Sequence, residues 1–208
     1  MRSPRIRTTA ATAIAGLAAA FAMTASALPA SAATLVHAAY KVTGSTFIKA
    51  PNATMHLGPG KLASTLNAGT GKLTATLTLP DATLSYKQSG LIPVTAVTRF
   101  INDGPTTGTL NLNTGAVKTT SKITLRIVSL TVAGLPVPVG NSCQSATPAV
   151  VKVTSQKGFN VLDGGNLAGT YTIPKFANCG LLTTPVINQT VTGPGNTITL
   201  RLGKARIG

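Results

Sequence analysis

Residues 72–79 read KLTATLTL and alternate strictly between apolar side chains and threonines. Successive side chains of a β-strand point to opposite faces, so this stretch would place its leucines and alanine on one face and its threonines on the other. The alternation therefore predicts a strand with one buried face. A second strand is expected at residues 61–67, and the Ala-Gly-Thr-Gly connection at 68–71 indicates a β-hairpin between the two.

Similar patterns recur over most of the chain. Threonine and valine are abundant, turn sequences rich in Gly, Pro and Asn separate the runs, and no long helical periodicity is found. We therefore expect an all-β fold, an antiparallel sandwich or barrel of about ten strands. The expected strands cover residues 36–42, 46–48, 61–67, 72–79, 83–87, 93–101, 109–112, 116–133, 149–155, 168–173 and 197–202.

One segment near the C-terminus has helix punctuation. Thr184 can cap a helix, Pro185 suits a first helical turn, and Gly193-Pro194 suits a stop. The apolar positions between them have helical spacing, although their β-branched side chains also suit a strand. We expect one short helix at about residues 185–192.

The first residues have the order of a secretory signal peptide. Three arginines within residues 2–7 precede an apolar run at residues 8–25, and Ala-Ser-Ala at 30–32 is a small-residue cleavage site. This order predicts a signal peptide over residues 1–32 and a single secreted β domain over residues 33–208. The alternative is an uncleaved anchor, but the run falls short of the ~20 strongly apolar residues of a typical span. We expect an extracellular or loosely envelope-associated protein with no transmembrane anchor after cleavage.

Two cysteines, Cys143 and Cys179, stand 36 positions apart in the chain. In an exported protein two cysteines most simply form a disulfide. The chain-entropy model assigns roughly 3–4 kcal/mol to closing a loop of this length. Two free thiols, or a metal site shared with distant histidines, are the alternatives.

Part of the C-terminal region resembles known sequences. The stretch FANCGLL at residues 176–182, followed by GPGNT at 193–197, resembles C-terminal stretches of secreted β proteins of actinobacteria whose function is uncharacterised. The resemblance implies an exported β protein and supplies no catalytic residue.

Residues suited to catalysis or metal binding are few. The chain has no Glu, and its three acids, Asp81, Asp103 and Asp163, lie in turn-like sequences where aspartate accepts local backbone hydrogen bonds. The two histidines, His37 and His56, have no metal-ligand partner at suitable spacing. We therefore expect no enzyme, no metal and no cofactor. A hydrolase whose Ser-His-Asp triad assembles from distant residues stays an alternative.

Charge is the most informative feature for function. The chain has 18 Lys and Arg against 3 acids, a formal net charge of +15. A surface of that sign attracts polyanions, and we expect an anionic cell-wall polymer or an anionic lipid surface as partner. The scattered aromatic residues do not favour specific nucleic-acid binding. The simpler alternative is that the charge serves solubility and protects sheet edges. The candidate polyanion-binding residues are Lys118, Lys122, Arg126, Lys152, Arg201, Lys204 and Arg206.

Residues 127–137, IVSLTVAGLPV, are apolar on both faces of a strand. Such a run is either buried on both faces or lines a cavity, and a β-barrel can be filled or can hold a small ligand. The sequence thus favours a non-catalytic, secreted or cell-envelope β protein with a basic surface. A carrier of a small apolar ligand or lipid is the second hypothesis, and a hydrolase is the third.

Overall fold

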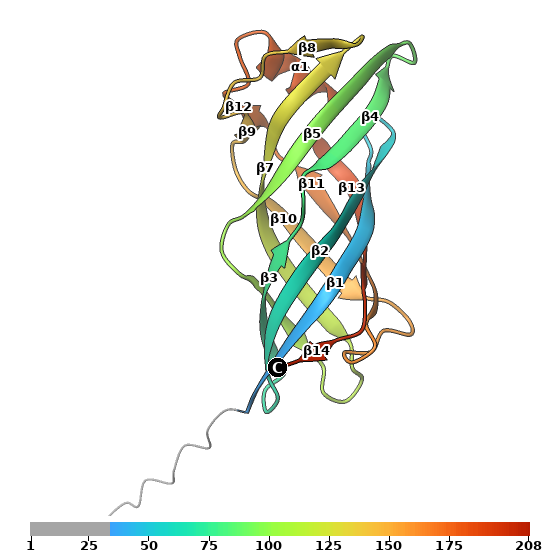
Figure 1. Cartoon of the computed structure of the whole chain (residues 1–208), viewed down its shortest axis with the longest axis vertical. Helices are drawn as coiled ribbons and strands as arrows, with labels where there is room; N and C mark the ends of the chain where they lie inside the picture. The colour runs from blue at the N-terminus through green and yellow to red at the C-terminus, as the bar shows by residue number, and fades with distance from the viewer. Residues whose placement is uncertain (1–33) are drawn as a thin grey trace, which may run out of the picture. The chain divides into compact units, whose positions relative to one another are not determined.

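In the computed structural model, residues 34–208 are described, and the expected signal peptide at residues 1–32 lies outside them. The described residues form an all-β body in which eight strands close into a barrel (Figure 1). The strands are β1 (Leu35–Ile48), β2 (Ala53–Asn67), β3 (Lys72–Thr78), β4 (Ala82–Gln88), β5 (Ile92–Asn102), β6 (Thr106–Leu110), β7 (Val117–Val132), β8 (Leu135–Val137), β9 (Gln144–Ser145), β10 (Ala149–Ser155), β11 (Gly165–Ile173), β12 (Phe176–Ala177), β13 (Gly193–Leu202) and β14 (Arg206–Ile207).

The barrel strands follow the order β10-β11-β13-β1-β2-β3-β6-β7, and pairing of β10 with β7 closes the ring. Each pairing is antiparallel. Of the two architectures expected from the sequence, the barrel is the one that forms. Closure gives each of these strands a neighbour on both sides over at least part of its length.

The long strand β7 has two different partners along one edge. Its first residues pair with β6, and from Ile123 onward it pairs with β5, which in turn pairs with β4. The β4–β5 hairpin thus completes the wall at the end of the barrel away from β14 (Figure 1). On its other edge β4 lies against the first half of β2, but within the described residues no hydrogen-bonded ladder joins these two strands.

Alternation along the strands produces the core. In β3, Ala75 is buried while Thr74 and Thr76 are exposed, as the 72–79 pattern predicts. In β13, Ile198, Leu200 and Leu202 are buried and the intervening residues are exposed. The inward side chains of all the barrel strands pack into one largely apolar interior, and most threonines lie on the outside, whereas Thr46 and Thr106 are buried.

Two inward-facing glycines allow neighbouring backbones to approach closely. A Cβ atom on Gly108 would overlap the carbonyl oxygen of Lys118, and a Cβ atom on Gly169 would overlap that of Lys152. Glycine within a strand commonly marks such a bend or close approach. These positions let the sheet coil tightly enough to close.

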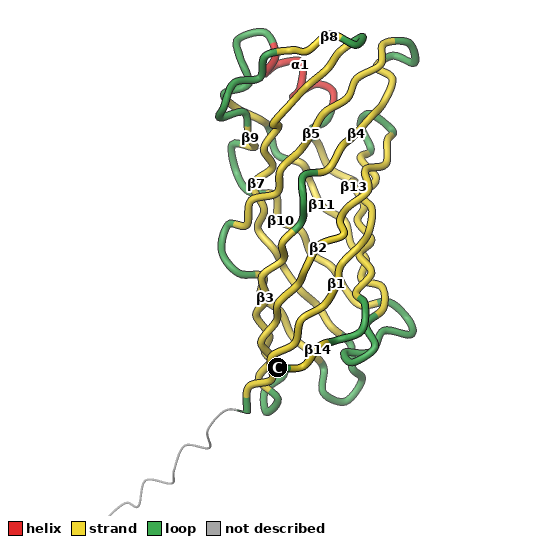
Figure 2. The backbone as a smooth tube through the Cα atoms, in the orientation of Figure 1, coloured by secondary structure: helices red, strands yellow, loops and turns green. Residues whose placement is uncertain are grey.

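One end of the barrel is covered by a group of elements that we name the crown, made of β8, β9, β12 and the helix α1 (Thr183–Thr190). The helix is the red segment in Figure 2. The expected helix is present but begins two residues earlier than predicted. Thr184 does not cap it, because its hydroxyl accepts a hydrogen bond from the amide of Cys179 at 3.1 Å. Pro185 is still accommodated, since it lies in the first turn, where backbone N–H groups have no intrahelical partner.

The expected disulfide is confirmed. Cys143 and Cys179 are bonded, and both are fully buried in the crown. The side chain of Asn188 in α1 adds two hydrogen bonds to the backbone of Phe176, at 2.6 and 3.0 Å. A disulfide of this kind indicates an oxidising compartment. Within residues 34–208, no helix has the length and apolar character needed to cross a membrane.

Candidate functional site

The predicted polyanion-binding residues divide between two walls of the barrel. Lys118 and Lys122 on β7 and Lys152 on β10 point outward and are exposed, as their even spacing predicted. Arg126, further along β7, is only half-exposed and lies opposite Arg99 of β5. Residues 201–206 belong to a different wall, formed by β13 and β14.

Lys118 and Lys152 of the first group belong to a surface that we name the lysine–threonine face. The register places Lys118 opposite Thr109 of β6 and Thr154 of β10, and Thr109 is in turn opposite Lys72 of β3. A second row of outward side chains lies beside this one, formed by Thr74, Thr107, Thr120 and Lys152. The face consists of Lys72, Thr74, Thr107, Thr109, Lys118, Thr120, Lys152 and Thr154. Sequence reasoning missed Lys72, although its outward position follows from the 72–79 alternation.

The second group belongs to a surface that we name the cationic wall, built on β1. Lys41 lies directly opposite Lys61 of β2. On the other edge of β1, Arg201 is paired with Thr43 and Arg206 with Ala39, which places both arginines diagonal to Lys41. The amide of Gly203 donates to the Lys41 carbonyl oxygen at 2.9 Å. This bond keeps Lys204, the next residue along the chain, beside β1. The cationic wall consists of Lys41, Lys61, Arg201, Lys204 and Arg206.

The side chains of the cationic wall are exposed and have no acidic partner among the described residues. Directly opposed residues in an antiparallel pair have Cβ atoms about 5 Å apart, and like charges there destabilise the sheet. Asp163 lies near this wall, because its neighbour Leu162 accepts a hydrogen bond from the amide of Ala205. Asp163 nevertheless forms no ion pair. The sequence could not reveal the opposition of Lys41 and Lys61, since it depends on strand register.

The one ion pair among residues 34–208 joins Arg99 to Asp81. Two hydrogen bonds from the guanidinium to the carboxylate, at 2.9 and 2.8 Å, lower the pKa of Asp81. The expectation that Asp81 accepts local backbone hydrogen bonds is therefore wrong. Asp81 follows β3 just where β4 begins, and the β4–β5 pairing brings Arg99 within reach.

The two histidines lie on the outside of the barrel. His37 is exposed on β1, and its Nδ1 atom lies 3.1 Å from the Thr65 hydroxyl. His56 is exposed on β2. Within the described residues neither ring has an aspartate as hydrogen-bond partner, and no three His, Cys, Asp or Glu residues cluster in a way that could hold a metal ion.

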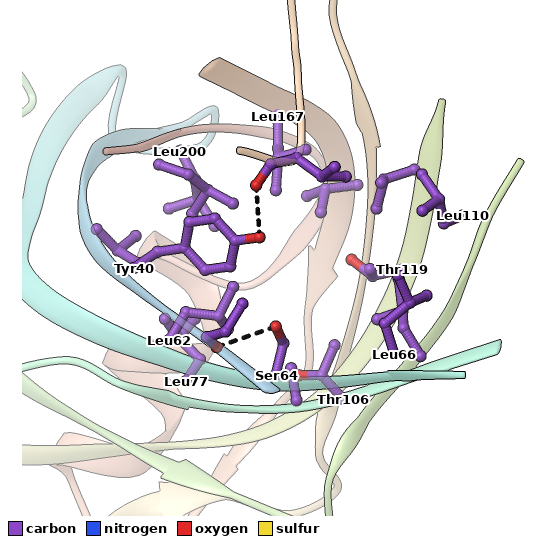
Figure 3. A pocket seen from close by; sticks show the side chains of 18 of the residues that line it. Tyr40, Leu62, Ser64, Leu66, Leu77, Thr106, Leu110, Thr119, Leu167 and Leu200 are labelled. Carbon is purple, nitrogen blue, oxygen red and sulfur yellow. Dashed lines mark hydrogen bonds between the residues drawn. The ribbon is translucent and has the colours of Figure 1, made fainter. Parts of the chain in front are cut away.

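The barrel interior contains a cavity of about 130 Å³ near the end that carries β14 (Figure 3). Its lining is mostly aliphatic, with Leu62, Leu77, Leu167 and Leu200 around it in Figure 3. The apolar run at residues 127–137 does not line this cavity. Ile127 is buried in the core near the crown, whereas Leu135 is 70% exposed at the β7–β8 turn, so the cavity is lined by other residues than the sequence suggested.

Four of the five polar side chains of the cavity bond to one another or to the backbone, and Thr119 is the fifth. The Tyr40 hydroxyl donates to the Val161 carbonyl oxygen at 2.8 Å, and the Ser64 hydroxyl donates to that of Ala38 at 3.1 Å. The hydroxyls of Thr106 and Ser121 lie 2.7 Å apart. Among the described residues no buried side-chain nitrogen or oxygen lacks a partner. The cavity wall therefore offers contacts to an apolar group rather than to a polar one.

These features define a closed antiparallel β-barrel with a positively charged outside and an apolar inside. No protein-family model, curated protein or solved structure matches the chain. The resemblance to secreted actinobacterial proteins stays a prediction, and proposals about function rest on the geometry.

Proposed function

We propose that this is a non-catalytic secreted protein that associates with anionic polymers of a cell envelope through its cationic wall. The observation that carries the proposal is the direct opposition of Lys41 and Lys61, with Arg201 and Arg206 at diagonal positions and no acid paired to any of them in the described chain. Five of the 18 basic residues thus lie together at a definite place.

An unneutralised cluster of cations is unfavourable in the free protein. Each added cation raises the local potential, and opposed like charges in a sheet cost free energy. A bound phosphate or carboxylate removes this cost and gains charge-assisted hydrogen bonds. The two arginines can hold such groups with paired N–H donors, and the lysines act as mobile point charges.

The layout suits a polymer better than a single ion. The wall extends over β2, β1 and β13, and strands lie about 4.8 Å apart, so its cations spread over about 10 Å across the strands. Several anionic groups in succession would be needed to contact all of them. Association of this kind would retain a protein at an envelope without a covalent anchor.

The test is co-sedimentation of the purified protein with isolated Gram-positive cell walls, with and without their anionic polymers, over a series of salt concentrations. Two triple variants are compared. One removes charge from the cationic wall (Lys41→Gln, Lys61→Gln, Arg201→Gln), and the matched control removes the same charge from the lysine–threonine face (Lys72→Gln, Lys118→Gln, Lys152→Gln).

Binding of the unmodified protein is expected to need the anionic polymer and to disappear at high salt. The wall variant is expected to lose at least about tenfold in affinity, because a hydrogen bond to a charged group contributes about 1.5–3 kcal/mol and 1.4 kcal/mol is tenfold. The control variant should change by less than about threefold. Equal losses of affinity in both variants would show that binding depends on the net positive charge of the whole protein, and would overturn the assignment of binding to the cationic wall. Absence of binding at low salt would overturn the function.

A further inference from the structure

The cavity inside the barrel lies apart from the charged outer surface and has a chemistry of its own. None of its lining residues is charged, and of its five hydroxyls those of Tyr40, Ser64, Thr106 and Ser121 are engaged within the protein, which leaves that of Thr119. We propose that this cavity is a binding site for a hydrocarbon group of about six carbons, held inside the barrel beneath a hydrogen-bonded cover loop.

The size of the cavity sets the size of the ligand. An engineered protein cavity of about 150 Å³ lined by Leu, Ile and Phe stays dry and binds benzene or xenon, and the present cavity measures about 130 Å³. Water needs two to four polar partners to be stable in such a space. The paired hydroxyls of Ser64, Thr106 and Ser121 have little left to offer it. An apolar occupant gains the dispersion contacts that an empty cavity forfeits.

The cavity is bounded along the barrel axis by large side chains. A smaller cavity of about 50 Å³ lies deeper in the barrel, and Leu77, Val153 and Leu200 line both spaces. These side chains separate the two, so a ligand longer than about six carbons would have to displace them. Shortening one of them should therefore lengthen the ligand that the barrel accepts.

The other end is closed by the loop between β10 and β11, at residues 156–164, which we name the cover loop. Phe159, Val161 and Leu162 of this loop line the cavity together with Ile207 of β14. Two hydrogen bonds hold the loop down, one from the Tyr40 hydroxyl to the Val161 carbonyl oxygen and one from the Ala205 amide to that of Leu162, at 2.8 Å each. Figure 3 shows Tyr40 reaching across the cavity to this contact.

This arrangement makes Tyr40 a latch. Burial raises the pKa of its hydroxyl, so the proton it donates to the cover loop is retained at neutral pH. Entry of a ligand requires the loop to move, since it covers the end of the cavity. Loss of the Tyr40 hydrogen bond should therefore increase the rates of entry and exit more than it changes the affinity.

The experiment is a titration of the methyl-labelled protein with benzene, followed by NMR, with octanoate as a second probe. Saturable shifts are expected for methyl groups around the cavity, among them those of Leu62, Leu167 and Leu200, and not for methyl groups of the crown. Ala75 faces the cavity and is 6% exposed, so Ala75→Leu should fill it and weaken benzene binding at least about tenfold. Ala96→Leu, at a similarly buried alanine outside the cavity lining, is the control and should bind within about twofold of the unmodified protein.

Two further variants allow the proposal to be tested even if the Ala75→Leu protein does not fold. Leu77→Ala should join the two cavities and increase the affinity for octanoate relative to benzene. Tyr40→Phe should speed benzene exchange while the same methyl groups still shift. Competition between octanoate and benzene in the unmodified protein would identify the end of an acyl chain as the ligand, and binding of benzene alone would identify a free small molecule.

The proposal is overturned if benzene gives no saturable shift, or if Ala75→Leu and Leu77→Ala leave the binding of both probes unchanged. Benzene is uncharged, so its binding should not respond to salt. That independence separates this result from the wall-binding experiment, and either proposal can fail without the other.

Discussion

Tyr171 illustrates how single polar groups are accommodated in the apolar interior. The Thr46 hydroxyl donates to the Thr197 carbonyl oxygen at 2.8 Å, which leaves it free to accept from the Tyr171 hydroxyl, 2.7 Å away. Each buried oxygen thereby has a partner, as burial of a hydroxyl requires. Burial raises the pKa of Tyr171.

We predict that Tyr171 makes the protein less stable as the pH rises above about 10. The unfolded chain ionises its tyrosines from that pH upward, whereas folded Tyr171 keeps its proton until a higher pH. The unfolded state then binds fewer protons, so the free energy of unfolding falls, by at most about 1.4 kcal/mol per pH unit for one group.

The measurement is urea unfolding from pH 8 to pH 11, comparing the unmodified protein with Tyr171→Phe. The variant should be less stable by about 1 kcal/mol at pH 8, because it lacks the hydrogen bond to Thr46. Its disadvantage should shrink above pH 10, since it lacks the titrating group. A constant difference over the whole range would contradict the prediction.

Among the structural elements, the crown depends most on a covalent bond. It contains the short strands β8, β9 and β12 and one helix of eight residues, α1. Few backbone hydrogen bonds join these pieces to the barrel, and helices of that length are not stable alone. The disulfide Cys143–Cys179 and the contacts of Asn188 hold them in place.

We predict that the variant Cys143→Ser with Cys179→Ser loses roughly 3–4 kcal/mol of stability, the loop-closure value for a separation of 36 residues. Thermal unfolding measures the loss, and proteolysis should cut the variant first between residues 178 and 182. The barrel should persist, because its strands pair independently of the crown. A variant as stable as the unmodified protein would contradict this assignment.

The elements also show what the sequence could and could not predict. Strict alternation sufficed to place strands such as β3 and β13, because a half-buried strand imposes a period of two. The exact start of α1 was missed, since the Thr184 hydroxyl accepts a hydrogen bond from the amide of Cys179 instead of capping the helix. The disulfide followed from the cysteine count and from the expected export of the chain.

At the scale of the molecule, strand order determines which side chains become neighbours. The β7–β10 pairing brings Lys152 close to Lys118, and the β1–β2 register sets Lys41 against Lys61. Neither contact is encoded in local spacing. The cavity was also beyond prediction, since whether a barrel is filled depends on the summed volumes of side chains from many strands. The apolar run 127–137, which suggested a cavity, instead ends at the exposed β7–β8 turn.

The cationic wall and the lysine–threonine face lie on opposite sides of the barrel. In the ring of eight strands, β1 and β7 are separated by three strands in either direction. A polymer bound to one surface would therefore leave the other free. The matched variants proposed above exploit this separation, since each changes the charge of one side only.

The missing ladder between β4 and β2 gives the barrel a seam. Amide groups of β4 that point away from β5 have no strand partner, so we predict that they exchange with deuterium far faster than those that point toward it. Amide exchange followed by NMR over residues 82–88 checks this expectation, and uniform protection along β4 would contradict it. At the seam the wall can part without breaking a ladder between β4 and β2, so the β4–β5 hairpin should swing outward before the remainder of the barrel unfolds.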